Sequence, residues 1–113
     1  MKEGNVALAR LPQADKQTKI RPVIVLRAMP FPGDFLVCGV SSQLRQRVEA
    51  FDEIISPVDD DFRVSGLLKE SLIRLGFLVV IPQNRIVGSI GSISTERHDR
   101  LLRKLSEYLK PRP

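Results

Sequence analysis

The sequence predicts a mainly β fold, made of antiparallel strands and closed by one C-terminal α-helix, which is an α+β arrangement. Two observations predict it. Short runs of β-branched and aliphatic residues recur between turn-forming residues along most of the chain, and helical spacing of apolar residues appears only near the C-terminus. The 113 residues suffice for one hydrophobic core but not for two, so we expect a single domain over residues 1–113.

The first two strands are predicted at residues 5–11 and 23–26, with a polar loop at residues 12–19 between them. Pro22 cannot donate a hydrogen bond within a sheet, so we expect it to be the first residue of the second strand. It also favours extended geometry at Arg21. The pattern therefore predicts an arginine held rigidly at the mouth of a strand, with a solvated charge as the alternative.

The middle of the chain predicts further short strands. A turn precedes a third strand at residues 35–40, and a fourth is expected at residues 51–55. Residues 72–81 are mostly apolar but contain Gly76, which predicts two short strands that meet at a turn or a bulge. The isoleucines, glycines and serines of residues 86–93 give no local structure that we can assign.

The last element is predicted to be an amphipathic helix. Ser94 is a suitable N-cap, Glu96 is favourable in the first turn, and Pro111 ends the helix. The apolar residues with helical spacing are Leu101, Leu102, Leu105, Tyr108 and Leu109. Basic residues are expected on the opposite face, either as a solvated surface or as an RNA contact; these are Arg97, Arg100, Arg103 and Lys104.

Composition limits the class of partner. The net charge of +5 and the isoelectric point near 9.9 favour a polyanion, because phosphate contacts release condensed counterions. Five Phe, one Tyr and no Trp provide few side chains for stacking on bases. No apolar run approaches the roughly 20 residues that span a bilayer. Because Cys38 is also the only cysteine, we expect a soluble protein of the reducing cytoplasm.

Several catalytic classes are disfavoured by the residues present. His98 is the only histidine, so a ribonuclease with two histidines is excluded within one chain, and a packing or surface role is expected for it. The acidic residues 59–61 are interpreted as a solvated loop rather than a metal site. Ser41 and Ser42 have no recognisable base beside them, and their alternative role is to cap a strand end.

Five segments together resemble the PemK/MazF family of toxin ribonucleases. In chain order they are GNVALARL, KIRPVIVL, VCGVSSQLRQ, SGLLKESLIRL and the closing GSIGSIS with its helix. The resemblance implies a small antiparallel β-barrel, SH3-like and of the PemK type, with flanking helices. It also implies a homodimer that cleaves single-stranded RNA, such as mRNA, at short sequences without a metal or other cofactor. An antitoxin whose tail blocks the RNA groove would neutralise it, and the basic charge predicts that this partner is acidic.

The resemblance also assigns site residues. The catalytic pair of the family falls on Arg21 and Ser41. The expected RNA-binding residues are Lys16, Gln17, Lys19, Ser42, Gln43 and Ser71. Three residues, Asn5, Lys16 and Lys19, depart from the family pattern. They leave open an alternative class, a noncatalytic module that binds a protein target, as gyrase-poison toxins do, or that binds RNA without cleaving it.

RNA carries its own nucleophile, the 2′-hydroxyl, so cleavage would leave a 2′,3′-cyclic phosphate and a 5′-hydroxyl. Arg21 provides a planar fork of donors for phosphate oxygens, and Ser41 provides one further donor. The general base is not identified, because an arginine holds its proton at neutral pH. Arg74 follows Leu72 in a predicted strand, where a salt bridge and an RNA contact are equally open.

Overall fold

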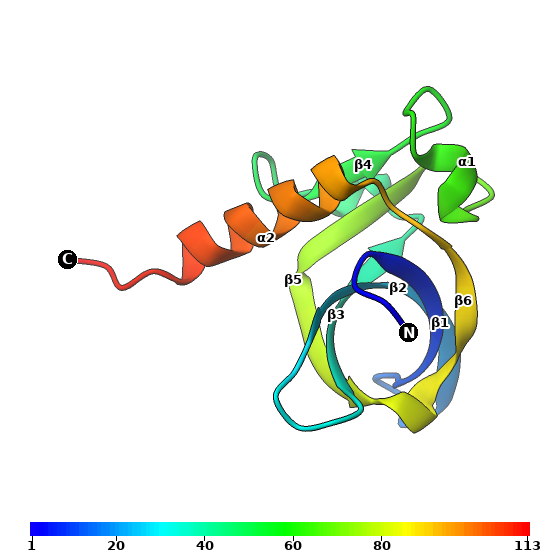
Figure 1. Ribbon diagram of the computed structural model, residues 1–113. Coiled ribbons are helices and arrows are strands. Elements are labelled where there is room, and N and C mark those ends of the chain that lie inside the picture. The colour runs from blue at the N-terminus through cyan, green and yellow to red at the C-terminus, as the bar shows by residue number, and fades with distance from the viewer.

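Six antiparallel strands form one strongly curled sheet with the order β4, β5, β3, β2, β1, β6, as shown by a computed structural model that describes residues 1–113 (Figure 1). The strands are β1 (Asn5–Pro12), β2 (Thr18–Ala28), β3 (Asp34–Ser41), β4 (Glu53–Ile55), β5 (Ser71–Pro82) and β6 (Ile86–Ser92). The helices are α1 (Phe62–Ser65) and α2 (Thr95–Leu109), with short 3₁₀ turns at Leu44–Gln46 and Gln83–Arg85. This architecture confirms the predicted mainly β fold with a C-terminal helix.

The second strand begins earlier than the sequence predicts. β2 starts at Thr18, and Pro22 lies within it, opposite Leu8 of β1. The pairing of β2 with β3 begins only at Val23, so the segment up to Pro22 has a neighbour on one side alone. A proline is tolerated there because its missing N–H leaves no hydrogen bond unmade on the free side. The loop predicted at residues 12–19 is therefore a shorter, tight turn. It is closed by a hydrogen bond of 2.7 Å from Gln13 N to Gln17 O.

The two faces of the sheet carry two separate apolar clusters. One cluster fills the interior of the curl with small and branched residues such as Ala7, Val25 and Val37. The other packs the outer face of the sheet against α2, where Leu101 and Leu105 of the helix are buried. Figure 1 shows the helix crossing the outside of the sheet and projecting beyond it. No helix in the chain is both long enough and apolar enough to cross a membrane.

Ser71–Pro82 form one strand, β5, rather than the two short strands predicted, and Gly76 lies in a bulge within it. The register of β5 with β3 jumps between two pairs, Cys38 with Leu78 and Gly39 with Arg74, so the residues between Arg74 and Leu78 have no partner on β3. The buried Asp52 compensates part of this loss, because its carboxylate accepts a hydrogen bond from Leu75 N at 3.0 Å. The bulge bends β5 and redirects the side chains that follow Arg74.

α2 begins as predicted, with Ser94 Oγ accepting a hydrogen bond from Arg97 N at 3.1 Å. The predicted surface position of Arg97 is wrong. Its guanidinium is buried and forms ion pairs with Asp61 at 2.8 Å, with Glu53 at 2.9 Å and with Asp59 at 3.1 Å. Arg97 precedes Leu101 by one helical turn, so it lies on the apolar face of the helix rather than opposite it.

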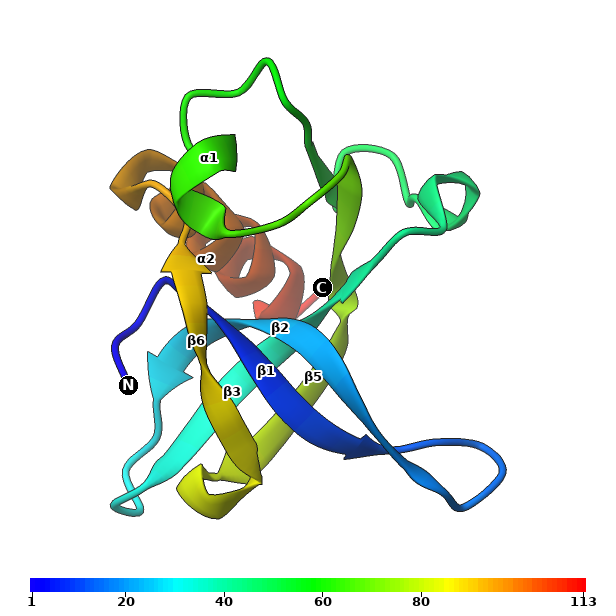
Figure 2. The same ribbon diagram turned by 90° about the vertical axis from the view of Figure 1, so that its right-hand side faces the viewer.

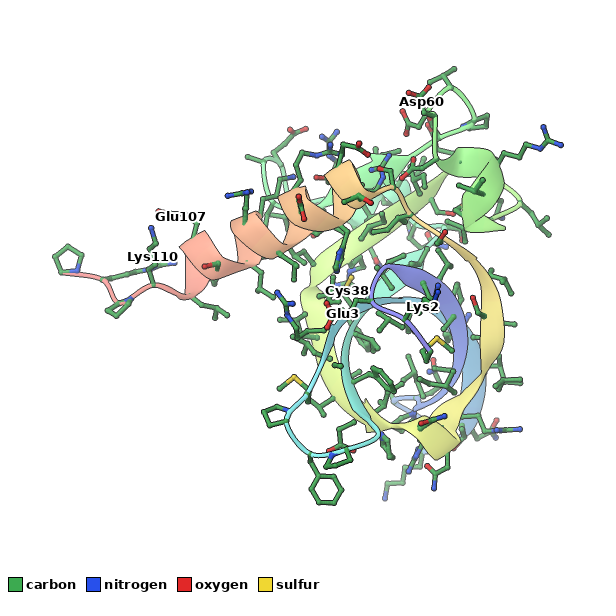
Figure 3. All side chains as sticks on the ribbon, in the orientation of Figure 1. Lys2, Glu3, Cys38, Asp60, Glu107 and Lys110 are labelled. Atoms are coloured by element: carbon green, nitrogen blue, oxygen red, sulfur yellow. The ribbon has the colours of Figure 1, made fainter.

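The acidic segment 59–61 is correspondingly not a solvated loop. Asp61 is buried, whereas Asp60 points outward from the loop, as Figure 3 shows. Burial alone would raise the pKa of Asp61, but hydrogen bonds from Arg97 and from Ser94 N lower it below its ordinary value. Burial would likewise raise the pKa of Glu53, and hydrogen bonds from Arg100 and Lys104 lower it. This Arg97 cluster joins α2, β4 and the segment before α1.

The short helix α1, which the sequence does not predict, lies directly on the backbone of β6 (Figure 2). A Cβ atom at Gly91 would overlap the carbonyl oxygen of Val64, and one at Gly66 would overlap that of Ile90. Gly66 also ends α1 with a φ of 77°, in the left-handed region that favours glycine. The two glycines therefore permit a contact between main chains, which fixes the loop that follows α1.

Candidate functional site

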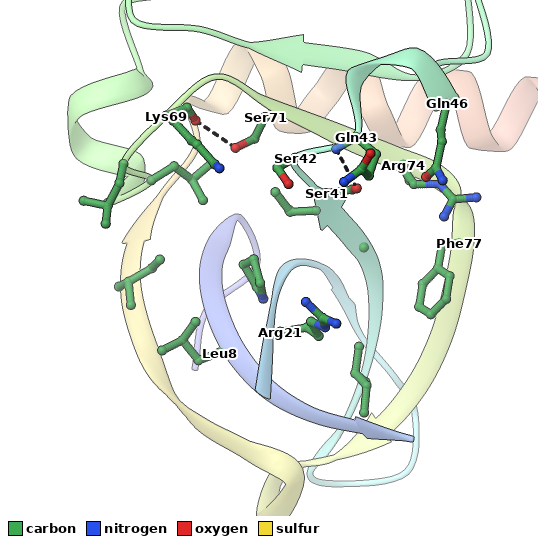
Figure 4. Close-up of a pocket in the computed structure, with 18 of the residues that line it drawn as sticks. Leu8, Arg21, Ser41, Ser42, Gln43, Gln46, Lys69, Ser71, Arg74 and Phe77 are labelled. Carbon is green, nitrogen blue, oxygen red and sulfur yellow. Dashed lines mark hydrogen bonds between the residues drawn. The ribbon is translucent and has the colours of Figure 1, made fainter. Parts of the chain in front are cut away.

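A groove of about 850 Å³ opens where β3 ends and β5 begins (Figure 4). Side chains from β1, β2, β3 and β5 line it, together with the loops after β3 and after α1. Five predicted site residues belong to its lining, and they are Arg21, Ser41, Ser42, Gln43 and Ser71. The fold therefore gathers residues that are far apart in the sequence into one concave surface.

The other three predicted residues, Lys16, Gln17 and Lys19, do not line the groove. They are exposed on the β1–β2 hairpin, which projects beyond the body of the sheet in Figure 2. Lys16 occupies the turn with a φ of 69°, and Lys19 pairs with Leu11 in the ladder. Because β2 starts at Thr18, the paired part of the hairpin is longer and its turn is shorter than the sequence predicts. The role of these residues in RNA binding remains a prediction.

The pairing of β1 with β2 fixes the backbone of Arg21. Arg21 pairs with Ala9 in the β1–β2 ladder, and its side chain lies on the same face of β2 as Val23, which is buried in the interior cluster. β3 turns away after Ser41, so the interior is open at this level and the guanidinium reaches the groove. Arg21 is exposed and forms no hydrogen bond or ion pair with the protein. Its donors are free for a ligand.

Ser41 and Ser71 differ in whether the hydroxyl is free to donate a hydrogen bond to a ligand. Ser41 Oγ accepts a hydrogen bond from Gln43 N at 3.0 Å, which leaves its hydroxyl hydrogen free to donate into the groove. Ser71 Oγ instead donates to the carbonyl of Lys69 at 2.8 Å, so its hydrogen is already used. Ser41 is therefore the better donor for a ligand, and Ser71 fixes the loop that carries Lys69.

The charge of the groove is entirely positive. Arg21, Lys69 and Arg74 line it, none of them forms an ion pair, and no Asp or Glu is among the lining residues. No histidine lines it either, because His98 lies on α2 with Nε2 at 2.8 Å from Leu26 O. His98 is half-buried, and this contact agrees with the packing or surface role expected for it. The groove can thus bind an anion, but it contains no side chain that accepts a proton at neutral pH.

Sequence reasoning missed several lining residues on the wall formed by β5 and the α1–β5 loop. Lys69 and Phe77 contribute there unpredicted, beside Arg74, for which the sequence leaves an RNA contact open. Phe77 was missed because the bulge at Gly76 reverses the alternation of faces that a regular strand would have. Gly76 was the signal that could have indicated it.

A curled antiparallel sheet with an outer C-terminal helix and a positively charged groove at one end defines a small β protein whose groove suits an anionic ligand. A family comparison identifies which one: the chain belongs to the PemK-like, MazF-like toxins of type II toxin-antitoxin systems, whose family model matches residues 2–109. No curated protein gives a significant match to the sequence.

Among the solved structures that share the fold are two from mycobacteria. The Mycobacterium tuberculosis toxin MazF-mt6 is 20% identical and superimposes with a TM-score of 0.68, over 91% of this chain and 93% of that one. An endoribonuclease in complex with its cognate antitoxin, from a mycobacterial species, is 12% identical with a TM-score of 0.72, over 100% of this chain and 99% of that one. At these identities the likeness establishes the fold alone.

Proposed function

We propose that this toxin is an endoribonuclease that cleaves single-stranded RNA, such as mRNA, in the cytoplasm at short sequences and without a metal ion. The observation that carries the proposal is the groove in which Arg21 and Ser41 both have free donors, beside two further unpaired cations and no carboxylate. Such a surface attracts the phosphate backbone and repels no part of it. Membership of the toxin family and the likeness to an endoribonuclease bound to its antitoxin support the same function.

The reaction needs little from the protein because the substrate contains the nucleophile. The 2′-oxygen attacks the adjacent phosphorus while the bond from phosphorus to O5′ breaks, which leaves a 2′,3′-cyclic phosphate and a 5′-hydroxyl. The 2′-hydroxyl loses its proton to water, since no lining side chain is a base, and O5′ takes one up from water. Arg21 and Ser41 stabilise the negative charge that grows on the nonbridging oxygens.

A long single-stranded RNA incubated with the purified protein in EDTA tests this proposal. We expect cleavage to persist, and we expect the new ends to be 2′,3′-cyclic phosphates and 5′-hydroxyls by mass spectrometry. Cleavage only when magnesium is added would refute the metal-independent mechanism. Binding should weaken steeply as salt rises, because each phosphate contact releases counterions.

The second candidate is a noncatalytic binding module, for RNA or for a protein target. It is favoured by one observation, the lack of a titratable base among the residues that line the groove. The two functions are separated by comparing binding with cleavage. Fluorescence anisotropy that shows binding to single-stranded RNA, with no cleaved product over long incubation, would select the binding module.

We also propose that two copies form a homodimer and that an acidic antitoxin segment occupies the groove. Tyr108 and Leu109, exposed at the projecting end of α2, support a shared interface, and the net charge of +5 supports an acidic partner. Sedimentation should give a mass near 25 kDa, twice the 12.7 kDa of the chain. An acidic peptide should compete with RNA, and this competition should weaken as salt rises. A monomer at micromolar concentration would contradict the dimer.

A further inference from the structure

Phe77 is the only aromatic side chain among the residues that line the groove. It is 42% exposed and belongs to neither apolar cluster, so it does not serve as a core residue. Two structural features place it there. The bulge of β5 turns it toward the groove, and the missing side chain of Gly39 leaves room for its ring, since a Cβ there would lie only 3.1 Å from Phe77 Cδ1.

The Phe77 ring also lies near a cation, Arg74. The guanidinium carbon of Arg74 lies 6.0 Å from the centroid of the Phe77 ring, at the outer limit of a cation–π contact. Gly39 thus leaves room for the ring beside the sheet, whereas the guanidinium of Arg74 is 6.0 Å from its centroid, so the exposed ring still has surface on which a base can stack. A ring already packed against the sheet loses little further freedom when a ligand stacks on it, which favours binding.

The position of Phe77 and Arg74 relative to Arg21 indicates which part of an RNA they would contact. In Figure 4, Arg21 lies near the centre of the groove, with Leu8 on one side of it and Arg74 with Phe77 on the other. If a phosphate sits at Arg21, the neighbouring nucleotide extends toward one of these walls. Leu8 offers only an aliphatic surface, whereas Phe77 offers a π-face beside a second cation.

We propose that Phe77 and Arg74 form a nucleobase subsite, in which the base of a nucleotide next to the cleaved phosphate stacks on Phe77. Arg74 contributes its charge to the adjoining phosphate. This inference rests on the proposed function, because it assumes that RNA occupies the groove. Stacking strength rises with the size of the π-surface, so the subsite prefers a purine over a pyrimidine without reading hydrogen-bond patterns.

The chain contains no tryptophan, so F77W introduces a single indole that reports on this subsite. The matched control is F31W, because Phe31 is 73% exposed and does not line the groove. The probe is a single-stranded 2′-O-methylated RNA, which has no free 2′-hydroxyl and is not cleaved. We expect saturable quenching of the indole fluorescence in F77W and none in F31W. A strand of the same length with abasic sites should bind with less quenching.

A second pair of variants tests the energetics in the chain without an added indole. F77L should weaken binding of the same RNA by about tenfold to a hundredfold, the range found when one stacking partner is removed. F31L should bind as the parent chain does. Both variants are compared by anisotropy after their circular dichroism spectra confirm the fold.

The outcomes separate this inference from the proposed function. Tight RNA binding without quenching in F77W, or unchanged affinity in F77L, overturns the nucleobase subsite and leaves the endoribonuclease proposal standing. Quenching in F77W by RNA, together with no cleavage of unmodified RNA by the parent chain, supports the subsite and overturns the endoribonuclease proposal. No RNA binding by anisotropy overturns both.

Discussion

Arg21 is the residue whose change most directly tests the site. R21A should abolish measurable turnover with little loss of stability, because the side chain is exposed and contacts no other residue through a hydrogen bond or ion pair. R21K should not restore activity, since an ammonium group cannot reproduce the planar fork that meets two phosphate oxygens. Initial rates on a single-stranded RNA, with circular dichroism as the check on folding, measure both effects. Normal cleavage by R21A would show that the site assignment is wrong.

Ser41 should contribute less than Arg21. S41A removes one neutral donor and also the acceptor of the bond from Gln43 N, so we expect turnover to fall by about one to three orders of magnitude. S71A is the matched control within the same groove. The hydroxyl of Ser71 already donates its hydrogen to the carbonyl of Lys69, so S71A should lower turnover less than S41A does. An equal loss in both variants would mean that loop structure rather than donation determines the rate.

Arg97 offers a contrasting case, in which a charge stabilises the fold. R97A would leave Asp61 buried without its main partner and would remove one of the three cations that pair with Glu53, so we expect a loss of about 3–5 kcal/mol in the free energy of unfolding. R103A on the same helix is the control, because Arg103 is exposed and forms no ion pair. Urea denaturation followed by circular dichroism measures both. Equal stability of the two variants would contradict the structural role of the Arg97 cluster.

These residues show which parts of a site are visible in a sequence. The extended geometry of Arg21 was predictable from its neighbour Pro22, but its place in the strand was not, because β2 starts at Thr18 and Arg21 lies within it rather than at its mouth. The partners of Arg97 lie 36 and 44 residues away in the chain, and no local pattern indicates which carboxylates will meet it. Its spacing from Leu101 was the one local sign of burial.

At the scale of elements, the strands were predictable where hydrophobic runs are bounded by turns, and this holds for β1, β3 and α2. β6 could not be assigned, because its residues Ile86–Ser92 contain two glycines and two serines and show no clear alternation. α1 could not be predicted, since four residues provide no helical period. β6 is instead held by its pairing with β1, and α1 by the contact of its main chain with β6, rather than by their own propensities.

The contact between α1 and β6 makes a sharp prediction. G91A places a methyl group against the carbonyl oxygen of Val64, so we expect it to lower the free energy of unfolding by about 1–3 kcal/mol. G88A lies in the same strand with no atom near its Cβ position and should change stability by less than about 1 kcal/mol. Thermal unfolding measures both. G91A should also weaken RNA binding, because the loop after α1 carries Lys69 into the groove. Equal melting temperatures would contradict the contact.

At the scale of the whole molecule, two groups of positive charges differ in whether they have partners. Those on the inner side of α2 are neutralised by carboxylates, whereas those around the groove have no partner. The net charge of +5 was visible in the sequence, but its distribution was not, because it depends on which strands become neighbours. The groove therefore keeps its positive charge although the chain contains 13 acidic residues.

The ion pairs of Glu53 and Asp61 with the cations of α2 predict that the free energy of unfolding falls at acidic pH. The pKa values of Glu53 and Asp61 are lowered in the folded protein, so both carboxylates add stability above their unfolded values near 4. That stability is lost as the pH falls through the lowered folded values. We expect the free energy of unfolding, measured in urea, to decline from about pH 5 to pH 3. D61N should flatten this decline, and a stability that stays constant across the same range would contradict it.

The glycines between α1 and β6 also have a consequence for genetics. Every single-nucleotide missense change of a glycine codon adds at least a methyl group, and at Gly91 or Gly66 there is no room for one. In a selection for bacteria that survive expression of this toxin without an antitoxin, escape mutations should therefore gather at these two codons as well as at Arg21. The codon for Gly88 should remain unselected. Mutations at the contact between the main chains of α1 and β6 would then inactivate the toxin as readily as mutations in the groove.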